Sequence, residues 1–200
     1  KIQTQIDHLV LPARLLFQGL VRAHGFLRDK TGLNLGRVLF RPVHLAFGGR
    51  LRYLVSGAAP LEPGVFERLR SLGFGVHEGY GLTEASPVLT VGWPRYATPP
   101  GSVGWPLPGI EVRILDADEA GVGEVIARGP TIMAGYLDAP EETARALQGG
   151  WLHTGDRGRL DEDGRLFIVG RDKDTIIDGS GKNVYPDEIE EIYGGHPLVK

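Results

Sequence analysis

The segment LRYLVSGAAPLEPGVFERLRSLGFGV, residues 51–76, carries the pattern that decides the fold. Apolar side chains alternate at its start, as in a strand: Leu51, Tyr53 and Val55. Four later residues share one helical face: Val65, Phe66, Leu69 and Leu72. Residues 73–76 then fit a short buried strand. This order predicts α/β architecture, as part of a parallel α/β layer whose ligand crevice lies beyond the carboxyl ends of the strands. The loops at 56–60 and 77–84 are expected to open there.

The sequence before this segment predicts helices, and the sequence after it predicts strands. Residues 6–26 repeat apolar side chains at helical spacing, which is typical of core-facing helices. Beyond a stretch rich in proline and glycine, short strands are expected at 110–115, 124–128 and 166–169. One helix at 140–147 interrupts them, and Asp163 with Gly164 forms a hairpin turn. These patterns predict a β-rich subdomain.

Charge and glycine content rise together from Gly170 onward, which indicates a domain boundary near residues 170–174. We therefore expect the α/β layer within residues 1–100, the β-rich subdomain within 101–170 and a further segment within 171–200.

Composition excludes several classes of protein. The 200 residues are 42% hydrophobic and 24% charged, which is typical of a globular chain with a sizeable core. A net charge of -3 without a basic block disfavours nucleic-acid binding. The absence of cysteine excludes disulfides and thiolate zinc sites. No apolar run approaches the roughly 18 residues of a membrane span, so we expect a soluble, cytoplasmic protein. Because the chain opens at Lys1, we also expect it to be a piece of a longer protein.

Several generic motifs fail when their spacing is checked. The run from Gly179 to Asn183 resembles a phosphate-binding P-loop, but that motif needs glycine at the place of Ile176 and serine or threonine at the place of Asn183. The glycines from 73 to 81 do not form GxGxxG, and Ser56 lies in no GxSxG. The six histidines show no close metal-binding spacing.

Two short segments carry side chains suited to a nucleotide. Residues 79–84, GYGLTE, combine glycines, an aromatic ring, a hydroxyl and a carboxylate. Asp156 follows a glycine turn, where its two oxygens could accept hydrogen bonds from a vicinal diol. Structural alternatives are a glycine-rich turn that ends on a helix capped by Thr83, and a turn-capping aspartate. Residues 170–174 and 179–183 could equally form a charged linker.

Because these segments occur together and in order, the chain resembles the AMP-forming acyl-CoA synthetases of the adenylate-forming superfamily, most closely the long-chain fatty-acid type. The resemblance extends from about Leu51 to the end. It rests on these segments: SGAAP (56–60), GYGLTE (79–84), GSVGWPLPG (101–109), GEVIARGPTIMAGY (123–136), GWLHTGD (150–156), GRDKD (170–174) and GKNVYPDEIE (181–190).

The resemblance implies a ligase that uses ATP, Mg²⁺ and coenzyme A to activate a fatty acid, first as an acyl-adenylate and then as a thioester. It assigns the adenine to Gly57, Ala58, Ala59, Glu78, Gly79, Tyr80 and Gly81, with the Tyr80 ring stacked on the base. Thr83 would contact the α-phosphate and Glu84 would hold Mg²⁺. Asp156 would accept the ribose hydroxyls, and Arg171 would contact the ribose or phosphate side.

The resemblance also assigns roles to the C-terminal segment. Lys173 matches the hinge about which the small C-terminal α+β domain rotates between the half-reactions, and that domain would begin within residues 171–200. Gly179, Gly181 and Lys182 would border the coenzyme A channel.

Some family features are missing, which leaves alternatives open. No phosphate loop precedes Leu51, the adenylation lysine near the end of the small domain is absent, and the loop 178–181 is one residue longer than the common form. We therefore expect this chain alone to be inactive. The alternatives are a non-catalytic nucleotide-binding or interaction module, and an aryl or amino-acid adenylating enzyme. Uncovered apolar faces around Leu54, Val65 and Phe66 would favour a homo-oligomer.

Overall fold

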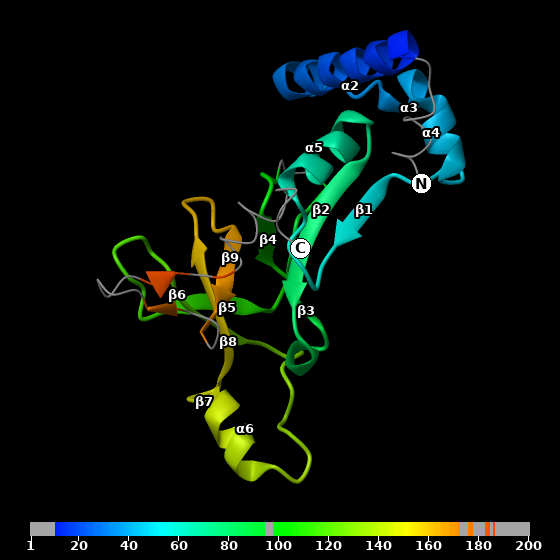
Figure 1. Cartoon of the computed structure of the whole chain (residues 1–200). Coiled ribbons are helices and arrows are strands. Elements are labelled where there is room, and N and C mark those ends of the chain that lie inside the picture. Colours follow the sequence, from blue (N-terminus) through cyan, green and yellow to red (C-terminus); the bar gives the residue numbers. More distant parts are fainter. Residues whose placement is uncertain (1–10, 95–97, 173–175, 178–182, 185, 187–200) are drawn as a thin grey trace. The chain divides into compact units, whose positions relative to one another are not determined.

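The computed structural model describes residues 11–94, 98–172, 176–177, 183–184 and 186. The chain divides into two compact units, and most of their helices and strands are labelled in Figure 1. The first unit consists of Lys1–Leu54 and Glu62–Val76, and the second of Val55–Leu61 and His77–Lys200. The neighbouring strands β1 (Tyr53–Ser56) and β2 (Gly75–Gly81) each begin in the first unit and end in the second.

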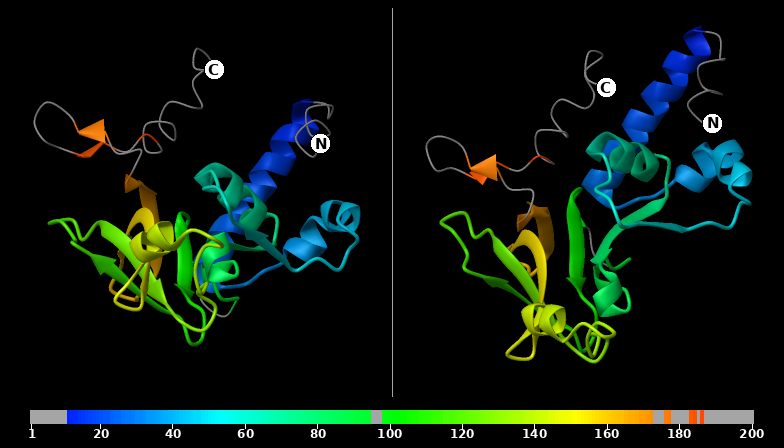
Figure 2. Two further views of the ribbon diagram at one scale, coloured as in Figure 1. Left: turned by 90° about the horizontal axis from the view of Figure 1, so that it is seen from below. Right: turned by 60° about the horizontal axis from the view of Figure 1, so that its bottom comes forward.

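The first unit is helical. It contains α2 (Leu11–Thr31), α3 (Gly36–Leu39), α4 (Arg41–Ala46) and α5 (Pro63–Ser71). Helices α2 and α5 pack against each other, as both views in Figure 2 show. Pro63 suits the first turn of α5 because proline lacks the N–H that would have no acceptor there. The core is aromatic: Phe40, Phe66 and Phe74 are almost completely buried.

The apolar side chains of the first unit are not all covered as the sequence predicts. Leu16 on α2 is 75% exposed, although its helical spacing predicts a core-facing position. Phe17, which the same spacing places on a core-facing side, and His24 each form an edge-to-face ring contact with Phe40. The expectation that Phe66 is uncovered is also wrong, because its side chain is only 1% exposed. Helical spacing thus predicts the position of Phe17 correctly and that of Leu16 wrongly.

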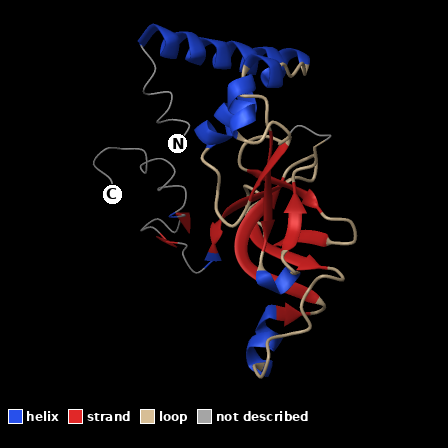
Figure 3. Ribbon diagram, turned by 90° about the vertical axis from the view of Figure 1, so that its right-hand side faces the viewer, coloured by secondary structure: helices blue, strands red, loops and turns tan. Residues whose placement is uncertain are grey.

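The second unit is built mainly of strands, which curve strongly (Figure 3). Its further strands are β3 (Val88–Val91), β4 (Ser102–Pro106), β5 (Glu111–Leu115), β6 (Gly123–Arg128), β7 (Leu147–Gln148), β8 (Trp151–Leu160) and β9 (Leu166–Arg171). From β2 onward the sheet order is β2-β3-β4-β9-β8-β6-β5, with antiparallel neighbours throughout, and β7 pairs with β8. A short pair, β10 (Ile176–Ile177) and β11 (Asn183–Val184), forms a separate sheet.

The mixed α/β class and the β-rich character of the later sequence are confirmed. The strands expected at 110–115, 124–128 and 166–169 correspond to β5, β6 and β9. The helix expected at 140–147 is α6 (Pro140–Ala146). Among the described residues, only β1, α5 and β2 form the expected strand–helix–strand arrangement, because the strand pairings beyond β2 are antiparallel. The expected division into residues 1–100, 101–170 and 171–200 stays a prediction.

The loop expected at 77–84 is partly wrong, because β2 continues to Gly81. β3 pairs with this part of β2, and the register shifts between Tyr80 and Gly81. A side chain at Gly81 would collide with the carbonyl oxygen of Pro87. Glycine is therefore needed at 81 because another backbone lies against it, and not because the chain turns there.

The pairing of β8 with β9 contains a one-residue offset. From the hairpin turn inward, Leu160 pairs with Leu166 and Gly158 with Ile168. The register then shifts between Arg157 and Gly158, and Asp156 pairs with Arg171. A Cβ atom on Gly158 would lie 2.6 Å from the carbonyl oxygen of Phe167, so this position also requires glycine. Among the described residues, no helix is both long and apolar enough to cross a membrane.

Candidate nucleotide site

Asp156 on β8 is the centre of the candidate site, which lies within the second unit. Its side chain is 8% exposed. The Tyr80 hydroxyl donates a hydrogen bond to Oδ2 of Asp156 over 2.6 Å. Nε of Arg171 forms an ion pair with Oδ1 of the same carboxylate over 3.1 Å. The structure therefore brings together three of the residues that the sequence singles out.

Each of the three groups is positioned by a strand. Asp156 and Arg171 are directly paired across β8 and β9. Tyr80 lies on β2, and its ring packs against a buried cluster that includes Ala85, Leu89 and Leu152. Packing of the ring and a hydrogen bond at its tip together fix the tyrosine.

Burial raises the pKa of Tyr80 far above its ordinary value, and the hydrogen bond to Asp156 raises it further. Tyr80 therefore remains a neutral donor throughout the physiological range. The Arg171 side chain is 69% exposed, so its positive charge is accessible to a ligand. A carboxylate has about four lone-pair positions. Asp156 can therefore accept hydrogen bonds from two neighbouring hydroxyls while it keeps both protein partners.

The loop 56–60 is anchored by Glu78 of β2, which is 4% exposed. Its Oε1 accepts a hydrogen bond from the Gly101 N–H over 2.9 Å, and its Oε2 accepts one from the Leu61 N–H over 3.4 Å. A Cβ atom on Gly57 would lie 3.3 Å from the carbonyl oxygen of Gly79, so the loop runs close to β2. The Glu78 carboxylate thus binds the backbone N–H groups of Leu61 and Gly101. Because its carboxylate is engaged in this way, we expect residue 78 to contact a base through its main chain.

The loop residues differ in conformation and exposure. Ala58 adopts a left-handed conformation with φ of 69°, which an L-residue rarely takes outside turns. Gly57, Ala58 and Ala59 are all exposed. Their small side chains leave the backbone accessible, which agrees with contact to a flat ring.

Thr83 and Glu84 lie in a short 3-10 helix, η1 (Thr83–Ala85), after β2. Thr83 is exposed. Oε1 of Glu84 accepts a hydrogen bond from the Tyr136 hydroxyl over 2.7 Å, and its carbonyl oxygen accepts one from the Met133 N–H over 2.8 Å. The hydrogen bond to Glu84 raises the pKa of Tyr136.

Tyr136 is a site residue that sequence reasoning assigned no role, although it ends the quoted segment 123–136. A hydroxyl that approaches a candidate metal ligand cannot be read from local spacing, because 52 residues separate it from Glu84.

The chemistry around Glu84 fits magnesium. The described residues contain no group of three or more His, Asp or Glu side chains that could hold a metal by themselves. Mg²⁺ is commonly bound by one or two carboxylates together with substrate phosphates and water. A single carboxylate beside the hydroxyl of Thr83 is therefore compatible with Mg²⁺ delivered as a complex with ATP. The remaining predicted residues, Lys173, Gly179, Gly181 and Lys182, lie outside the described residues.

Comparison with known proteins identifies the family of the chain. A family model described as AMP-binding enzyme matches residues 4–137. The long-chain-fatty-acid–CoA ligase of Yersinia pestis is 44% identical over 162 residues, which cover 78% of this chain and 28% of the relative. The ligase of the same description from Bacillus subtilis (strain 168) is 40% identical over 157 residues, which cover 75% of this chain and 28% of the relative. The chain thus spans about 28% of the length of these curated relatives.

A solved structure supports the same relationship. O-succinylbenzoate coenzyme A synthetase (MenE) from Bacillus subtilis, in complex with AMP, superimposes with a TM-score of 0.69 and 34% identity. The match covers 74% of this chain and 32% of that chain.

Proposed function

Because this chain belongs to the AMP-binding enzyme family, we propose that its second unit forms the adenosine-binding part of an ATP-dependent ligase that joins long-chain fatty acids to coenzyme A. The observation that carries the proposal is the convergence of Tyr80 and Arg171 on the two oxygens of Asp156.

In this proposal the ribose of AMP binds at Asp156. The two hydroxyls of the ribose donate to the carboxylate, and Arg171, which is paired with the same carboxylate, faces the ribose or phosphate side. The Tyr80 ring lies under the adenine, and the exposed backbone of residues 57–59 covers the edge of the base.

Thr83 and Glu84 serve the phosphate end of the nucleotide. The exposed hydroxyl of Thr83 donates to the α-phosphate. Glu84 would hold Mg²⁺, which supplies positive charge against the negative charge of the triphosphate. Tyr136 donates to one oxygen of Glu84 and so orients the carboxylate.

The reaction follows from the weak reactivity of a carboxylate. A fatty carboxylate attacks the α-phosphorus of ATP, the bond to the β-phosphate oxygen breaks, and an acyl-adenylate and pyrophosphate form. The thiol of coenzyme A then attacks the acyl carbon, loses its proton, and displaces AMP. Donors fixed in advance around the α-phosphate lower the barrier of the first step because they do not have to reorganise. The proposal also includes Lys173 as the hinge between the two half-reactions. It places the coenzyme A channel beside Gly179, Gly181 and Lys182.

The long-chain substrate is supported by the descriptions of the relatives from Yersinia pestis and Bacillus subtilis. An aryl substrate is supported by the description of MenE as an O-succinylbenzoate synthetase. Measurement of kcat/KM of the whole protein with palmitate, benzoate and an amino acid separates these candidates. Highest kcat/KM for palmitate is expected, and highest kcat/KM for benzoate would overturn the long-chain assignment.

Calorimetry with the 200-residue chain tests the nucleotide site directly. We expect AMP to bind, and Asp156→Asn to weaken its affinity by about tenfold to a hundredfold, the loss expected for charge-assisted hydrogen bonds worth about 1.5–3 kcal/mol. Glu119→Gln is the matched control, because Glu119 is an exposed carboxylate in the same unit. Equal AMP affinity in the wild type and Asp156→Asn would remove the ribose assignment.

A pyrophosphate-release assay addresses the non-catalytic alternative. We expect the 200-residue chain to bind AMP without releasing pyrophosphate from ATP and palmitate, and the whole protein to release it. A whole protein that binds AMP but releases no pyrophosphate with any of the three carboxylates would favour a nucleotide-binding module.

A further inference from the structure

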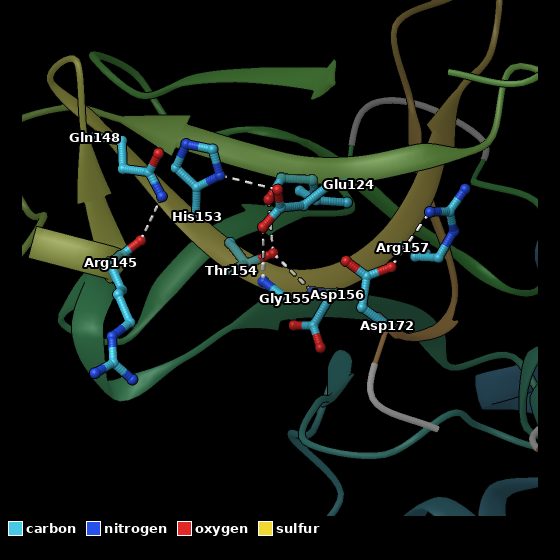
Figure 4. A network of polar contacts seen from close by, with 10 residues as sticks. Glu124, Arg145, Gln148, His153, Thr154, Gly155, Asp156, Arg157 and Asp172 are labelled. Carbon is cyan, nitrogen blue, oxygen red and sulfur yellow. Dashed lines mark hydrogen bonds and ion pairs between the residues drawn. The ribbon is translucent and has the colours of Figure 1, made fainter. Parts of the chain in front are cut away.

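The strand segment that leads to Asp156 is held by a second group of polar residues that the nucleotide proposal does not use. In this group, shown in Figure 4, the side chain of Glu124 on β6 reaches His153 and Gly155 of β8, with Thr154 between them. Here the pairing of β6 with β8 is irregular, with a register shift between Glu124 and Ile126. Gly155 takes a left-handed conformation with φ of 68°. The backbone immediately before Asp156 therefore departs from a regular strand.

Both carboxylate oxygens of Glu124 accept hydrogen bonds from this irregular segment. Oε2 accepts a hydrogen bond from Nδ1 of His153 over 2.9 Å, and Oε1 accepts one from the Gly155 N–H over 3.2 Å. The side chains of Glu124 and His153 are 20% and 19% exposed, so water competes with these contacts only weakly. One side chain from β6 thus replaces the regular backbone pairing that the register shift interrupts.

Thr154 links the backbone of Asp156 to β6. Its hydroxyl donates to the Val125 carbonyl oxygen over 2.6 Å and accepts a hydrogen bond from the Asp156 N–H over 3.1 Å. The backbone of Asp156 is therefore tied to β6 through a single hydroxyl. Tyr80 and Arg171 hold the carboxylate of Asp156, whereas Glu124 and Thr154 hold the backbone that carries it.

We propose that Glu124 and Thr154 are positioning residues for the ribose contact of Asp156, a role that rests on the proposed nucleotide site. They set the turn at residues 154–155 and thereby the place of the Asp156 Cα. Two neighbouring hydroxyls bind one carboxylate only over a narrow range of positions, and in enzyme active sites a misplacement of about 1 Å can lower a reaction rate by about a hundredfold. A change at Glu124 therefore acts on ribose recognition without touching the nucleotide.

Ribose recognition is measured as the ratio of the Kd for 2′,3′-dideoxy-AMP to the Kd for AMP, using calorimetry on the 200-residue chain. Glu124→Gln keeps the shape of the side chain but presents an amide in place of one acceptor oxygen. We expect it to lower the ratio by about three- to tenfold, which corresponds to one weakened hydrogen bond. Thr154→Val should lower the ratio similarly, whereas Thr154→Ser, which retains the hydroxyl, should restore it. Glu119→Gln is the control for loss of an exposed carboxylate.

A purely structural role predicts a different result. Loss of stability alone would reduce the folded fraction and weaken both ligands equally, so the ratio would not change. Hydrogen exchange of the Gly155 and Asp156 amides provides a readout without nucleotide, and both should exchange faster in Glu124→Gln. A ratio and exchange rates that match those of the wild type would overturn the proposal.

The double variant separates this inference from the proposed function. We expect the double variant Asp156→Asn with Glu124→Gln to show the same Kd ratio as Asp156→Asn alone, because the two residues act through the same contact. If Asp156→Asn lowers the ratio but Glu124→Gln and Thr154→Val do not, the positioning role fails and the ribose site stands. If Asp156→Asn itself leaves the ratio unchanged, the ribose site fails.

Discussion

Replacement of Tyr80 by phenylalanine removes the hydroxyl that donates to Asp156 and leaves the packed ring in place. The O–H···O distance of 2.6 Å lies in the short range of charge-assisted hydrogen bonds. Its acceptor is a carboxylate that is largely removed from water. Hydrogen bonds to charged groups contribute about 1.5–3 kcal/mol. We therefore expect Tyr80→Phe to lower the free energy of unfolding by about 2 kcal/mol at neutral pH.

The same hydroxyl should make stability depend on alkaline pH. Since burial and the bond to Asp156 raise the pKa of Tyr80, the folded chain keeps this proton while the unfolded chain loses it above about pH 10. The contribution of Tyr80 is then fully present below that pH and is lost as the pH rises. For one proton the free energy of unfolding falls by about 1.4 kcal/mol per pH unit. Tyr80→Phe should lack this part of the decline.

Urea unfolding followed by tryptophan fluorescence, at neutral pH and between about pH 9 and pH 11, measures both effects. Tyr53→Phe is the control, because Tyr53 is 51% exposed. The reasoning would be refuted by a change under about 0.5 kcal/mol at neutral pH together with parallel alkaline curves for wild type and Tyr80→Phe.

Three further changes test other parts of the structure. Glu84→Gln should abolish the increase in ATP affinity that Mg²⁺ produces, while AMP affinity stays unchanged, as calorimetry with and without Mg²⁺ would reveal. Gly81→Ala should destabilise the chain by about 2 kcal/mol or more in urea unfolding because its Cβ has no room, whereas Gly19→Ala, with nothing within 4 Å, should not destabilise it. Burial acts to raise the pKa of Asp161, but hydrogen bonds from Arg165 outweigh it and lower the pKa. The stabilising effect of Asp161 is therefore present above its unfolded-state pKa of about 3.9 and is lost as the pH falls further, so Asp161→Asn should flatten the acid limb of a plot of urea midpoint against pH.

The parts of the fold that sequence could predict are those with local signals. Strand β5 alternates apolar side chains at Val112 and Ile114, β6 contains a short apolar run, and the turn before β9 contains Asp163 and Gly164. β8 has no such alternation, because its buried positions are Leu152, Asp156 and Gly158. A strand that buries a carboxylate and a glycine is stabilised by its neighbouring strands, so the pattern of its own residues does not predict that it is a strand.

The candidate site shows the same division. Residue types and family resemblance singled out Tyr80, Asp156 and Arg171, but the hydrogen bond between Tyr80 and Asp156 joins positions 76 residues apart. The positions of Glu124 and Tyr136 are likewise set by pairing between distant strands and loops. Contacts of this kind depend on the register of the sheet, which hydrophobic periodicity alone does not define where strands are irregular.

The offset between β8 and β9 has an electrostatic consequence. If the ladder that starts at Leu160 and Leu166 continued without interruption, Asp156 would stand across from Gly170, and the guanidinium would be carried to the opposite surface of the sheet. The extra residue, Val169, shifts Arg171 by one position along β9. The negative charge of Asp156 is thereby compensated by a positive charge on the same surface of the sheet. Any homologue in which this bulge is lost would keep both residues in its sequence and yet separate their charges.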